Sequence, residues 1–563
     1  MPEGHDAGAL GDSLLSLLPG TNKPASARWS GVRSLLQLKT DSLGKLGLVA
    51  VLAALCGTGV LYILNTEAKE IEQQGYNLTY AAAFVVLLIG YRVAQLTLIR
   101  RTSSEIEGAL NQKRHRAVEL ALSLSIRDLE KIEKQSIRDG LNAHYGAISQ
   151  ALVPLISGVE ASILLLFMFV YLMTLSPIAS LITVVVMTFT TIGYVNHARK
   201  MSDALRSSAG WEATFRRQAD GITGGAKELQ LGATKRVALQ QAMCDSSQNL
   251  AESRSNAAWF FADLIATGTS ISYFLAGIIV FMLPIFSGDD TDTLSQTVIA
   301  IIFILGPMGS LVSSMQNAAT AQFSLKSINE FEDTLKQLVG ERAPHADAFD
   351  FGEFESLELK SVQYQHGEEN GFAISNINLT LERGEIVFLT GGNGSGKTTL
   401  LRVMCGLYPR AGGSIKLNGQ ETPPATTQAF RELFSSVFSD FYLFDDLYGL
   451  GEADLPALEN WLVKLDIRDK IRLDFSDVHG EHLSTGQRKR LALALALTEK
   501  RPVLVLDEWA ADQDPETRRW FYETLIPQLK SDGVTCFVIT HDESYFDCCD
   551  RRLHMIEGYL EEE

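Results

Sequence analysis

Hydrophobic and polar positions divide the chain into a strongly apolar first half and a more polar second half. Apolar stretches close to the length that crosses a bilayer as a helix, about 20 residues, recur between Leu46 and Val312. They are Leu46–Leu64, Leu78–Leu98, Leu152–Leu172, Ile178–Tyr194, Leu264–Phe286 and Val298–Val312. Backbone groups inside lipid must be hydrogen-bonded within their own segment, so the pattern predicts six membrane-spanning helices.

Two long connections follow the second and the fourth of these stretches, at residues 101–147 and 199–256. Both are compatible with helix, which rises about 1.5 Å per residue, and both begin with clustered Lys and Arg. Positive charge favours the cytoplasmic side of a membrane, whereas the short opposite loops are acidic, for example at Glu67 and Asp289. We therefore expect two cytoplasmic arms that continue the membrane helices, and both chain termini in the cytoplasm.

Two polar features of this half can each be interpreted in two ways. Asp220–Leu231, in the second arm, contains glycines and a short amphipathic piece, and is either a contact with a soluble domain or a solvated turn. The ionisable residues of the apolar stretches either face a cargo cavity or lie near the ends of the spans, where long side chains reach the interface. These residues are Arg92, Glu160 and Asp263.

The second half begins with the alternation of a strand at Leu357–Tyr364. An apolar strand at Glu385–Thr390 then runs directly into Gly391–Thr398 (GGNGSGKT), which is followed by the helical Thr399–Leu407. This is the GxxxxGK[ST] phosphate loop in its required context of strand, loop and helix. We therefore predict an all-α transmembrane domain followed by an α/β phosphate-loop ATPase domain.

The phosphate loop has a specific chemistry. Gly391, Gly394 and Gly396 let the backbone turn its N–H groups toward phosphates, and the helix N-terminus adds partial positive charge. Lys397 is expected to reach the β- and γ-phosphates of ATP, and the Thr398 hydroxyl to bind Mg²⁺. The other residues of the loop that we expect to bind the nucleotide are Asn393, Ser395 and Thr399.

Two later strands carry candidate catalytic residues. The buried strand of Val503–Glu508 (VLVLDE) ends in an acidic pair, in which Asp507 would bind Mg²⁺ and Glu508 would orient and deprotonate the attacking water. The apolar strand Cys536–Thr540 ends at His541, where the γ-phosphate could be sensed. ATP and Mg²⁺ are the cofactors that this set of residues predicts.

Composition narrows the possible partners. The formal net charge is −18, which argues against nucleic acid, because phosphate binding needs clustered Lys and Arg. The six cysteines lack metal-ligand spacing. The acidic start of the chain does not fit a cleaved signal peptide. We expect residues 1–40 to be a cytosolic extension, 41–335 the transmembrane domain, 336–354 a linker and 355–563 the ATPase domain.

Leu483–Gln487 (LSTGQ) resembles the signature of ATP-binding-cassette proteins, and it lies between GGNGSGKT and VLVLDE in the order of that family. The resemblance implies that Ser484 and Gly486 contact the γ-phosphate held by a second copy of the chain, which makes the transporter a homodimer with the exporter fold. The neighbouring signature residues Thr485 and Gln487 would share that contact. Tyr364 matches the family's adenine-stacking aromatic residue, and Asp514 the end of the loop after the catalytic Glu.

One position departs from the family pattern. The Gln that precedes the coupling loop falls at Ser439, within Val437–Phe444 (VFSDFYLF), and serine is too short for the usual contacts with metal and water. Asp440 is a possible substitute. The segments VFSDFYLFD, DEWAADQDP, FYETLIPQLK and GAKELQL resemble bacterial cyclic-peptide exporters, including those for the pyoverdine precursor and microcin-type peptides.

The resemblance implies ATP-driven export of a peptide-derived metabolite across a bacterial inner membrane. Without a Cys/His peptidase domain before the spans, cleavage of a leader peptide is not expected. Three alternatives stay open: export of a lipid or drug, import of a siderophore by the same architecture, and a regulatory protein or channel that uses ATP only to switch shape. Glu508 and His541 favour turnover over gating.

Overall fold

The computed structural model describes residues 40–74, 77–287, 291–339, 352–366, 372–422, 428–473, 478–480 and 483–563. It divides into two compact units. The first holds the described residues up to Ser123 and those from Glu133 to Gln337, and the second holds Leu124–Ile132 and the described residues from Leu338 onward. The predicted N-terminal extension and most of the predicted linker lie outside the described residues.

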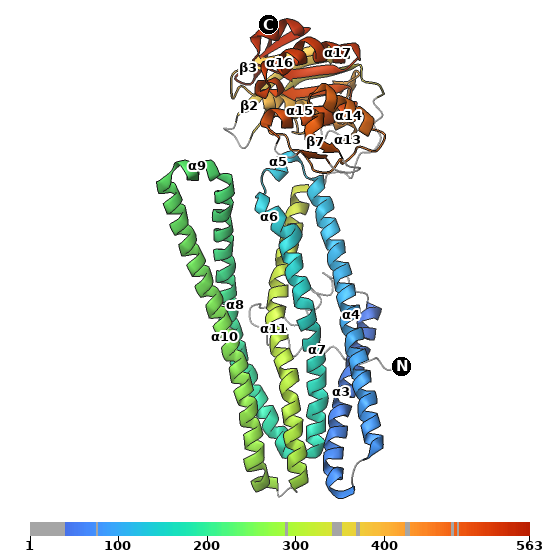
Figure 1. Cartoon of the computed structure of the whole chain (residues 1–563), viewed down its shortest axis with the longest axis vertical. Coiled ribbons are helices and arrows are strands. Elements are labelled where there is room, and N and C mark those ends of the chain that lie inside the picture. The colour runs from blue at the N-terminus through green and yellow to red at the C-terminus, as the bar shows by residue number, and fades with distance from the viewer. Residues whose placement is uncertain are drawn as a thin grey trace. The chain divides into compact units, whose positions relative to one another are not determined.

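The described part of the first unit is helical (Figure 1). Its helices are α3 (Thr40–Gln74), α4 (Leu78–Ser123), α6 (Lys134–Arg138), η1 (Asp139–Ala143), α7 (His144–Leu175), α8 (Pro177–Gly224), α9 (Ala226–Leu231), α10 (Ala233–Ser287) and α11 (Thr291–Val339). Among the described residues, five helices are long and apolar enough to cross a membrane, and the predicted fourth span falls in α8, whose described apolar stretch is Pro177–Val186. The predicted all-helical first domain is confirmed.

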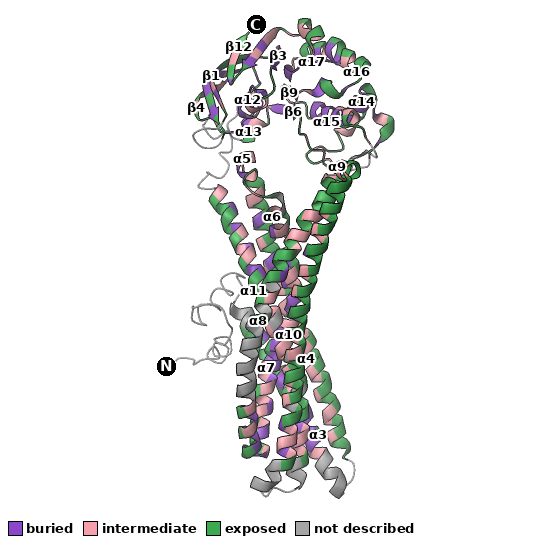
Figure 2. Ribbon diagram, turned by 90° about the vertical axis from the view of Figure 1, so that its left-hand side faces the viewer, coloured by how far each residue is buried: buried purple, intermediate pink, exposed green. Residues whose placement is uncertain are grey.

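Apolar side chains join these helices into a bundle. Buried Leu61 of α3, Leu172 of α7 and Ile279 of α10 belong to one apolar cluster. On α4, by contrast, Ile89 and Val93 are exposed, as side chains that face lipid would be. Buried and exposed positions alternate along the bundle accordingly (Figure 2). Helices α8 and α10 run side by side and are joined by α9, which has no buried residue.

The three ionisable residues of the predicted spans differ in their surroundings. Arg92 is exposed and Asp263 half-buried, whereas Glu160 is 3% exposed. Glu160 Oε2 accepts a hydrogen bond of 3.3 Å from Gln95 on α4. Its other carboxylate oxygen has no partner within the described part of the chain. Of the three, only Glu160 is buried, and a contact of any of them with cargo stays a prediction.

The second unit is an α/β domain built on two larger sheets. A six-stranded sheet has the order β12-β11-β3-β10-β9-β6, and all its neighbouring strands are parallel except β11 and β12. A four-stranded antiparallel sheet has the order β2-β1-β4-β5, and β7 pairs with β8. The strands are β1 (Ser356–Gln365), β2 (Ala373–Glu382), β3 (Ile386–Gly391), β4 (Gly412–Leu417), β5 (Gln420–Glu421), β6 (Phe434–Val437), β7 (Ile471–Leu473), β8 (Val478–Gly480), β9 (Val503–Asp507), β10 (Thr535–Ile539), β11 (Arg551–Ile556) and β12 (Tyr559–Glu562).

Helices cover both faces of the six-stranded sheet. The helices of this unit are α5 (Ile126–Leu129), α12 (Lys397–Met404), α13 (Gln428–Arg431), α14 (Leu455–Lys464), η2 (Arg468–Lys470), α15 (Thr485–Thr498), η3 (Trp509–Asp512), α16 (Pro515–Trp520), η4 (Phe521–Leu525), α17 (Ile526–Ser531) and η5 (Glu543–Cys548). Strand side chains alternate between faces. Val387 and Leu389 of β3 pack in the cluster that contains α12, whereas Ile386 and Phe388 pack in the cluster that contains α15. Helices α12 and α15 therefore lie on opposite faces.

Close packing in the helical unit gives a first prediction. A Cβ at Gly158 of α7 would lie 2.1 Å from the Cβ of Ser314 on α11, whereas a Cβ at Gly146 of the same helix meets nothing within 4 Å. We expect Gly158→Ala to lower the stability of the purified protein by about 1–3 kcal/mol, because overpacking forces the helices apart. Thermal unfolding measures this loss, and Gly146→Ala is the matched control. If Ser314→Gly does not restore the stability of Gly158→Ala, the two helices do not meet at this point.

Candidate functional site

Four parallel strands of the six-stranded sheet end at one edge, and each is followed by a predicted site residue. The register pairs Ile539 of β10 with both Leu389 of β3 and Asp507 of β9, and it pairs Val437 of β6 with Leu506 of β9. The carboxyl ends of parallel strands meet at the same edge, where ligands of open α/β sheets bind. The sheet thus brings together the phosphate loop, the acidic pair, Ser439 and His541.

The phosphate loop leaves β3 through a glycine whose conformation and close packing disfavour any side chain. Gly391 has a φ of 141°. A Cβ there would lie 2.4 Å from the carbonyl oxygen of Met555 on the neighbouring strand. The Lys397 ammonium folds back into the loop and donates to the carbonyls of Gly391, at 2.8 Å, and Gly392, at 3.0 Å. A buried cation therefore lies in the turn before α12.

Polar groups of the loop suit an anion. The Ser395 hydroxyl is buried and has no hydrogen-bond partner within the described chain. Helix α12 begins directly after Gly396, so its free N–H groups open into the same loop. Asn393 and Gly394 are exposed at the tip, and Thr399 is half-buried in the first turn of α12. An unpaired hydroxyl, a helix N-terminus and a lysine together form a donor set for phosphate oxygens.

Oxygen atoms converge on the buried carboxylate of Asp507. The Thr398 hydroxyl donates to Asp507 Oδ2 at 3.2 Å, and the Ser439 hydroxyl donates to the same oxygen at 3.0 Å. Hydroxyl and carboxylate oxygens are the ligands that Mg²⁺ prefers, and this ion commonly takes few protein ligands together with phosphates and water. No cluster of three or more His, Cys, Asp or Glu that could hold a metal occurs among the described residues.

Glu508 and His541 face each other beyond the sheet edge. His541 Nε2 lies 3.4 Å from Glu508 Oε1, and both side chains are partly open to solvent. Glu508 adopts a φ of 51°, a left-handed conformation that is strained for a side chain other than glycine. Its N–H donates to the carbonyl of Ile539, and its carbonyl accepts from Lys489 Nζ at 2.7 Å. The backbone is thus held so that the carboxylate points away from the core.

The LSTGQ residues form the N-terminus of α15. Ser484 caps this helix in a capping box with Gln487, in which each side chain binds the other residue's backbone N–H. Thr485 is exposed in the first turn. A Cβ at Gly486 would lie 2.6 Å from the carbonyl oxygen of Asp512, so the signature packs directly on the loop after Glu508. Because α12 and α15 cover opposite faces of the sheet, the signature does not share the face of its own phosphate-loop helix.

Asp514 holds that loop against the signature helix. Its carboxylate caps α16 by accepting from the N–H of Thr517 at 3.0 Å, and it pairs with Arg490 of α15. Hydrogen bonds from Thr517, with the nearby Arg490 charge, hold the pKa of Asp514 below its ordinary value. The residue is therefore ionised at neutral pH, which keeps the pairing with Arg490.

Tyr364, which the sequence predicts to stack on adenine, points into the core of the domain, and the adenine contact stays a prediction. Tyr364 is 2% exposed, and its ring stacks on Tyr408 with centroids 5.0 Å apart. The cause is a β-bulge near Ser361, whose φ is 48°, because the bulge reverses which side chains of β1 point inward. His366, just after β1, is exposed instead, and its N–H pairs with the carbonyl of Phe372.

Comparisons with known proteins agree with this geometry. Residues 374–511 match the family model described as ABC transporter. The ATP-binding protein SyrD of Pseudomonas syringae pv. syringae is 36% identical over 60% of this chain and 62% of its own length. An ATP-dependent lipid A-core flippase of Alkalilimnicola ehrlichii is 33% identical over 37% of each chain. A probable syringafactin export ATP-binding/permease protein, SyfD of Pseudomonas syringae pv. syringae strain B728a, is 32% identical over 36% of this chain.

These matches are partial, because the chain spans 62% of SyrD, 37% of the flippase and 33% of SyfD. A solved bacterial Atm1-family ABC exporter with ATP bound resembles the chain over a greater length. The likeness has a TM-score of 0.68 and covers 93% of this chain and 95% of that one, with 18% sequence identity. The chain therefore has the fold of an ABC exporter, a helical domain followed by an α/β domain, as predicted from the sequence.

The loop geometry predicts that alanine substitution of two adjacent glycines has very different effects on the affinity for ATP. Gly391→Ala would place a Cβ against the Met555 carbonyl at a φ that alanine rarely adopts, so we expect it to weaken ATP binding by about tenfold or more. A Cβ at Gly392 meets nothing within 4 Å, and Gly392→Ala is the matched control. Titration with a fluorescent ATP analogue measures both affinities. Equal affinities for the two variants would show that the Gly391 turn does not shape the nucleotide site.

Proposed function

We propose that the chain is one half of an ATP-driven exporter that hydrolyses ATP to move cargo across a membrane. One observation carries the proposal: the phosphate loop, Asp507, Glu508 and His541 meet at one edge of a parallel sheet, in a chain whose other unit contains helices long enough to cross a bilayer. The exporter fold supports the coupling of the two activities.

The site residues suggest a division of roles in hydrolysis. The N–H groups of Gly391–Gly396 and the Lys397 ammonium would hold the phosphates and stabilise charge on the transferred group. Glu508 would accept a proton from the attacking water, and His541, 3.4 Å from it, would contact the γ-phosphate and keep Glu508 oriented. Thr398 and Asp507 would hold Mg²⁺, which when bound neutralises phosphate charge.

A second copy of the chain would complete each site. Ser484, Gly486 and the α15 N-terminus lie on the face of the sheet opposite α12, so they are poorly placed to reach the nucleotide on their own phosphate loop. A homodimer places the signature of one copy on the phosphates of the other, with Asp514 at the boundary. ATP would then hold the two ATPase units together, and hydrolysis would release them.

The proposed setting is the inner membrane of a bacterium. Both arms and both termini would lie in the cytoplasm, where ATP is available, and lipid would cover exposed side chains such as Ile89 and Val93. Helix α9, with Leu231 91% exposed, is suited to the contact predicted for Asp220–Leu231. Closure of the ATPase units would turn the cargo cavity outward, and reopening would reset it.

We favour a peptide-derived cargo, a cyclic peptide or siderophore precursor. The similarity to a syringafactin export protein and the segments VFSDFYLFD and DEWAADQDP support this class. A second candidate is lipid, because the similarity to a lipid A-core flippase is of equal strength in identity. Fold does not decide between these cargos, since one architecture hosts many substrates.

Composite sites predict a specific cross-link. With the accessible native cysteines replaced and Glu508→Gln present, we expect ATP to link Asn393→Cys of one copy to Ser484→Cys of another as a covalent dimer on a gel. Copies that carry Asn393→Cys and Asp532→Cys, an exposed turn position, are the control and should stay monomeric. A link formed within one copy would contradict the proposed dimer.

The transport prediction concerns direction and cargo together. Inside-out vesicles that contain the protein should accumulate a labelled siderophore-type cyclic peptide when given ATP, and Glu508→Gln should abolish this uptake because no base activates water. Uptake confined to right-side-out vesicles loaded with ATP would overturn export in favour of import. Normal ATPase activity with uptake of a labelled lipid instead of the peptide would establish the second candidate.

A further inference from the structure

A short segment between two helices of the helical unit belongs to the α/β unit. Residues Leu124–Ile132 follow α4 and precede α6, yet they cluster with the second unit. Ser125 caps the small helix α5, and Ile126 packs against the apolar cluster that holds α12. The chain between α4 and α6 is therefore part of the unit that carries the phosphate loop.

Glu130 is the charged end of this anchor. Its carboxylate accepts from the Tyr408 hydroxyl at 2.9 Å and lies 3.4 Å from Arg402 Nη1. Arg402 Nη1 also donates to the Tyr408 oxygen at 2.7 Å. Burial raises the pKa of Tyr408, so its hydroxyl stays protonated and keeps donating. Tyr364 stacks on this ring from the core side and fixes its direction.

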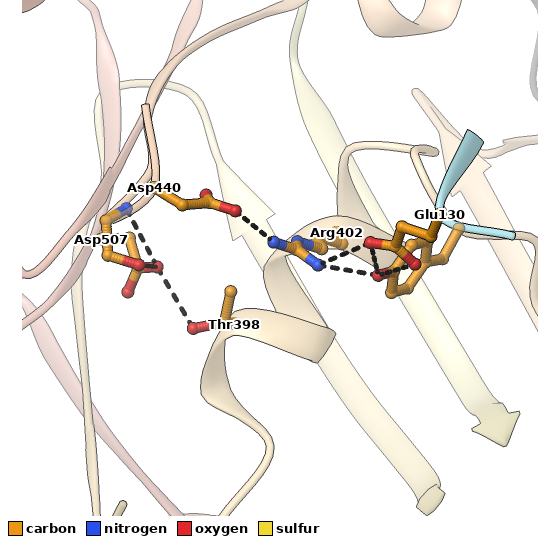
Figure 3. A network of polar contacts seen from close by, with 7 residues as sticks. Glu130, Thr398, Arg402, Asp440 and Asp507 are labelled. Atoms are coloured by element: carbon orange, nitrogen blue, oxygen red, sulfur yellow. Dashed lines mark hydrogen bonds and ion pairs between the residues drawn. The ribbon is translucent and has the colours of Figure 1, made fainter. Parts of the chain in front are cut away.

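Arg402 reaches a second carboxylate with its other nitrogen. Nη2 of Arg402 lies 2.9 Å from Asp440 Oδ2, and Figure 3 shows the guanidinium between Glu130 and Asp440. Asp440 follows Ser439, whose hydroxyl and N–H both face Asp507 Oδ2. A continuous set of contacts thus runs from the first arm to the carboxylate at the centre of the site. The Arg402 side chain is 21% exposed and that of Asp440 67% exposed, so solvent reaches and screens this contact from the Asp440 side.

We propose that Glu130, Arg402 and Asp440 form a charged relay by which the first arm positions Ser439 and Asp507, with Arg402 as the positioning residue. The proposal rests on the proposed ATPase function. A planar guanidinium binds two carboxylates in a fixed geometry, so displacement of Glu130 frees Arg402 and loosens the Asp440 loop. The relay holds the loop of Ser439 in place, because the serine side chain is too short for the metal and water contacts expected of a glutamine there.

This assignment makes a prediction about which kinetic constant changes. The relay ends at Asp507, not at the loop N–H groups that hold the phosphates, so its loss should act on kcat and leave KM for ATP nearly unchanged. Contacts within one network are non-additive. Glu130→Gln and Asp440→Asn should each lower kcat by about fivefold. The kcat of the double variant should be no lower than that of the less active single variant.

The experiment measures ATPase kinetics and hydrogen exchange on the full chain in lipid nanodiscs. In Glu130→Gln, we expect amides of residues 438–441 to exchange faster, and in Asp440→Asn the amides of 124–132, because coupling is reciprocal. Arg402→Lys keeps the charge but not the fork and should behave like the single variants. Glu459→Gln breaks a similar exposed ion pair with Arg468 and is the matched control.

Each outcome decides the relay separately from the proposed function. The relay would be overturned if the losses of kcat multiply in the double variant, or if hydrogen exchange changes only next to each substitution. In either case, ATPase activity of the wild-type protein would leave the proposed function intact. If the wild-type protein has no ATPase activity, the proposed function fails, and the exchange data alone then decide whether the arm and the Asp440 loop are linked. The relay is supported if hydrogen exchange changes at 438–441 in Glu130→Gln and at 124–132 in Asp440→Asn, and if neither change occurs in Glu459→Gln.

Discussion

The carboxylate of Asp507 is the interaction on which the candidate site depends. It is buried at the end of a central parallel strand, and it accepts from Thr398 of the phosphate-loop helix and from Ser439 of the neighbouring strand. A buried carboxylate is costly unless its oxygens are hydrogen-bonded, so these contacts fix the loops that supply the donors. The parallel sheet delivers those loops to one edge, and the site follows from that arrangement.

The two faces of the sheet keep the phosphate-loop helix and the signature helix apart. The phosphate-loop helix needs one apolar face to pack, and the signature helix α15 needs the other, because alternate residues of each strand supply the two clusters. Lys489 holds α15 to the loop after β9 through the Glu508 carbonyl and the Asp512 carboxylate, so movement at the signature reaches the proposed catalytic carboxylate. One α/β unit thus carries the two parts of the proposed composite site on opposite faces of its sheet.

Local rules made much of the fold predictable from the sequence. The apolar stretches and the strand, loop and helix around GGNGSGKT depend on neighbours in the chain, and the structure contains the predicted helices and the phosphate loop. The orientation of Tyr364 was not predictable, because one bulge at Ser361 reverses the strand's alternation. The pairing of Glu130 with Arg402, which are 272 residues apart, leaves no local pattern at all.

The same bulge that defeats the pattern builds the support for the proposed relay. With Tyr364 turned inward, its ring stacks on Tyr408, whose hydroxyl donates to Glu130. A glutamine at position 439 could reach the metal and water of the site with its own side chain. A serine is shorter, so its hydroxyl meets Asp507 only if the whole loop is held close to the sheet edge. Two carboxylates on one guanidinium achieve that placement, and they make it depend on the charge of the first arm.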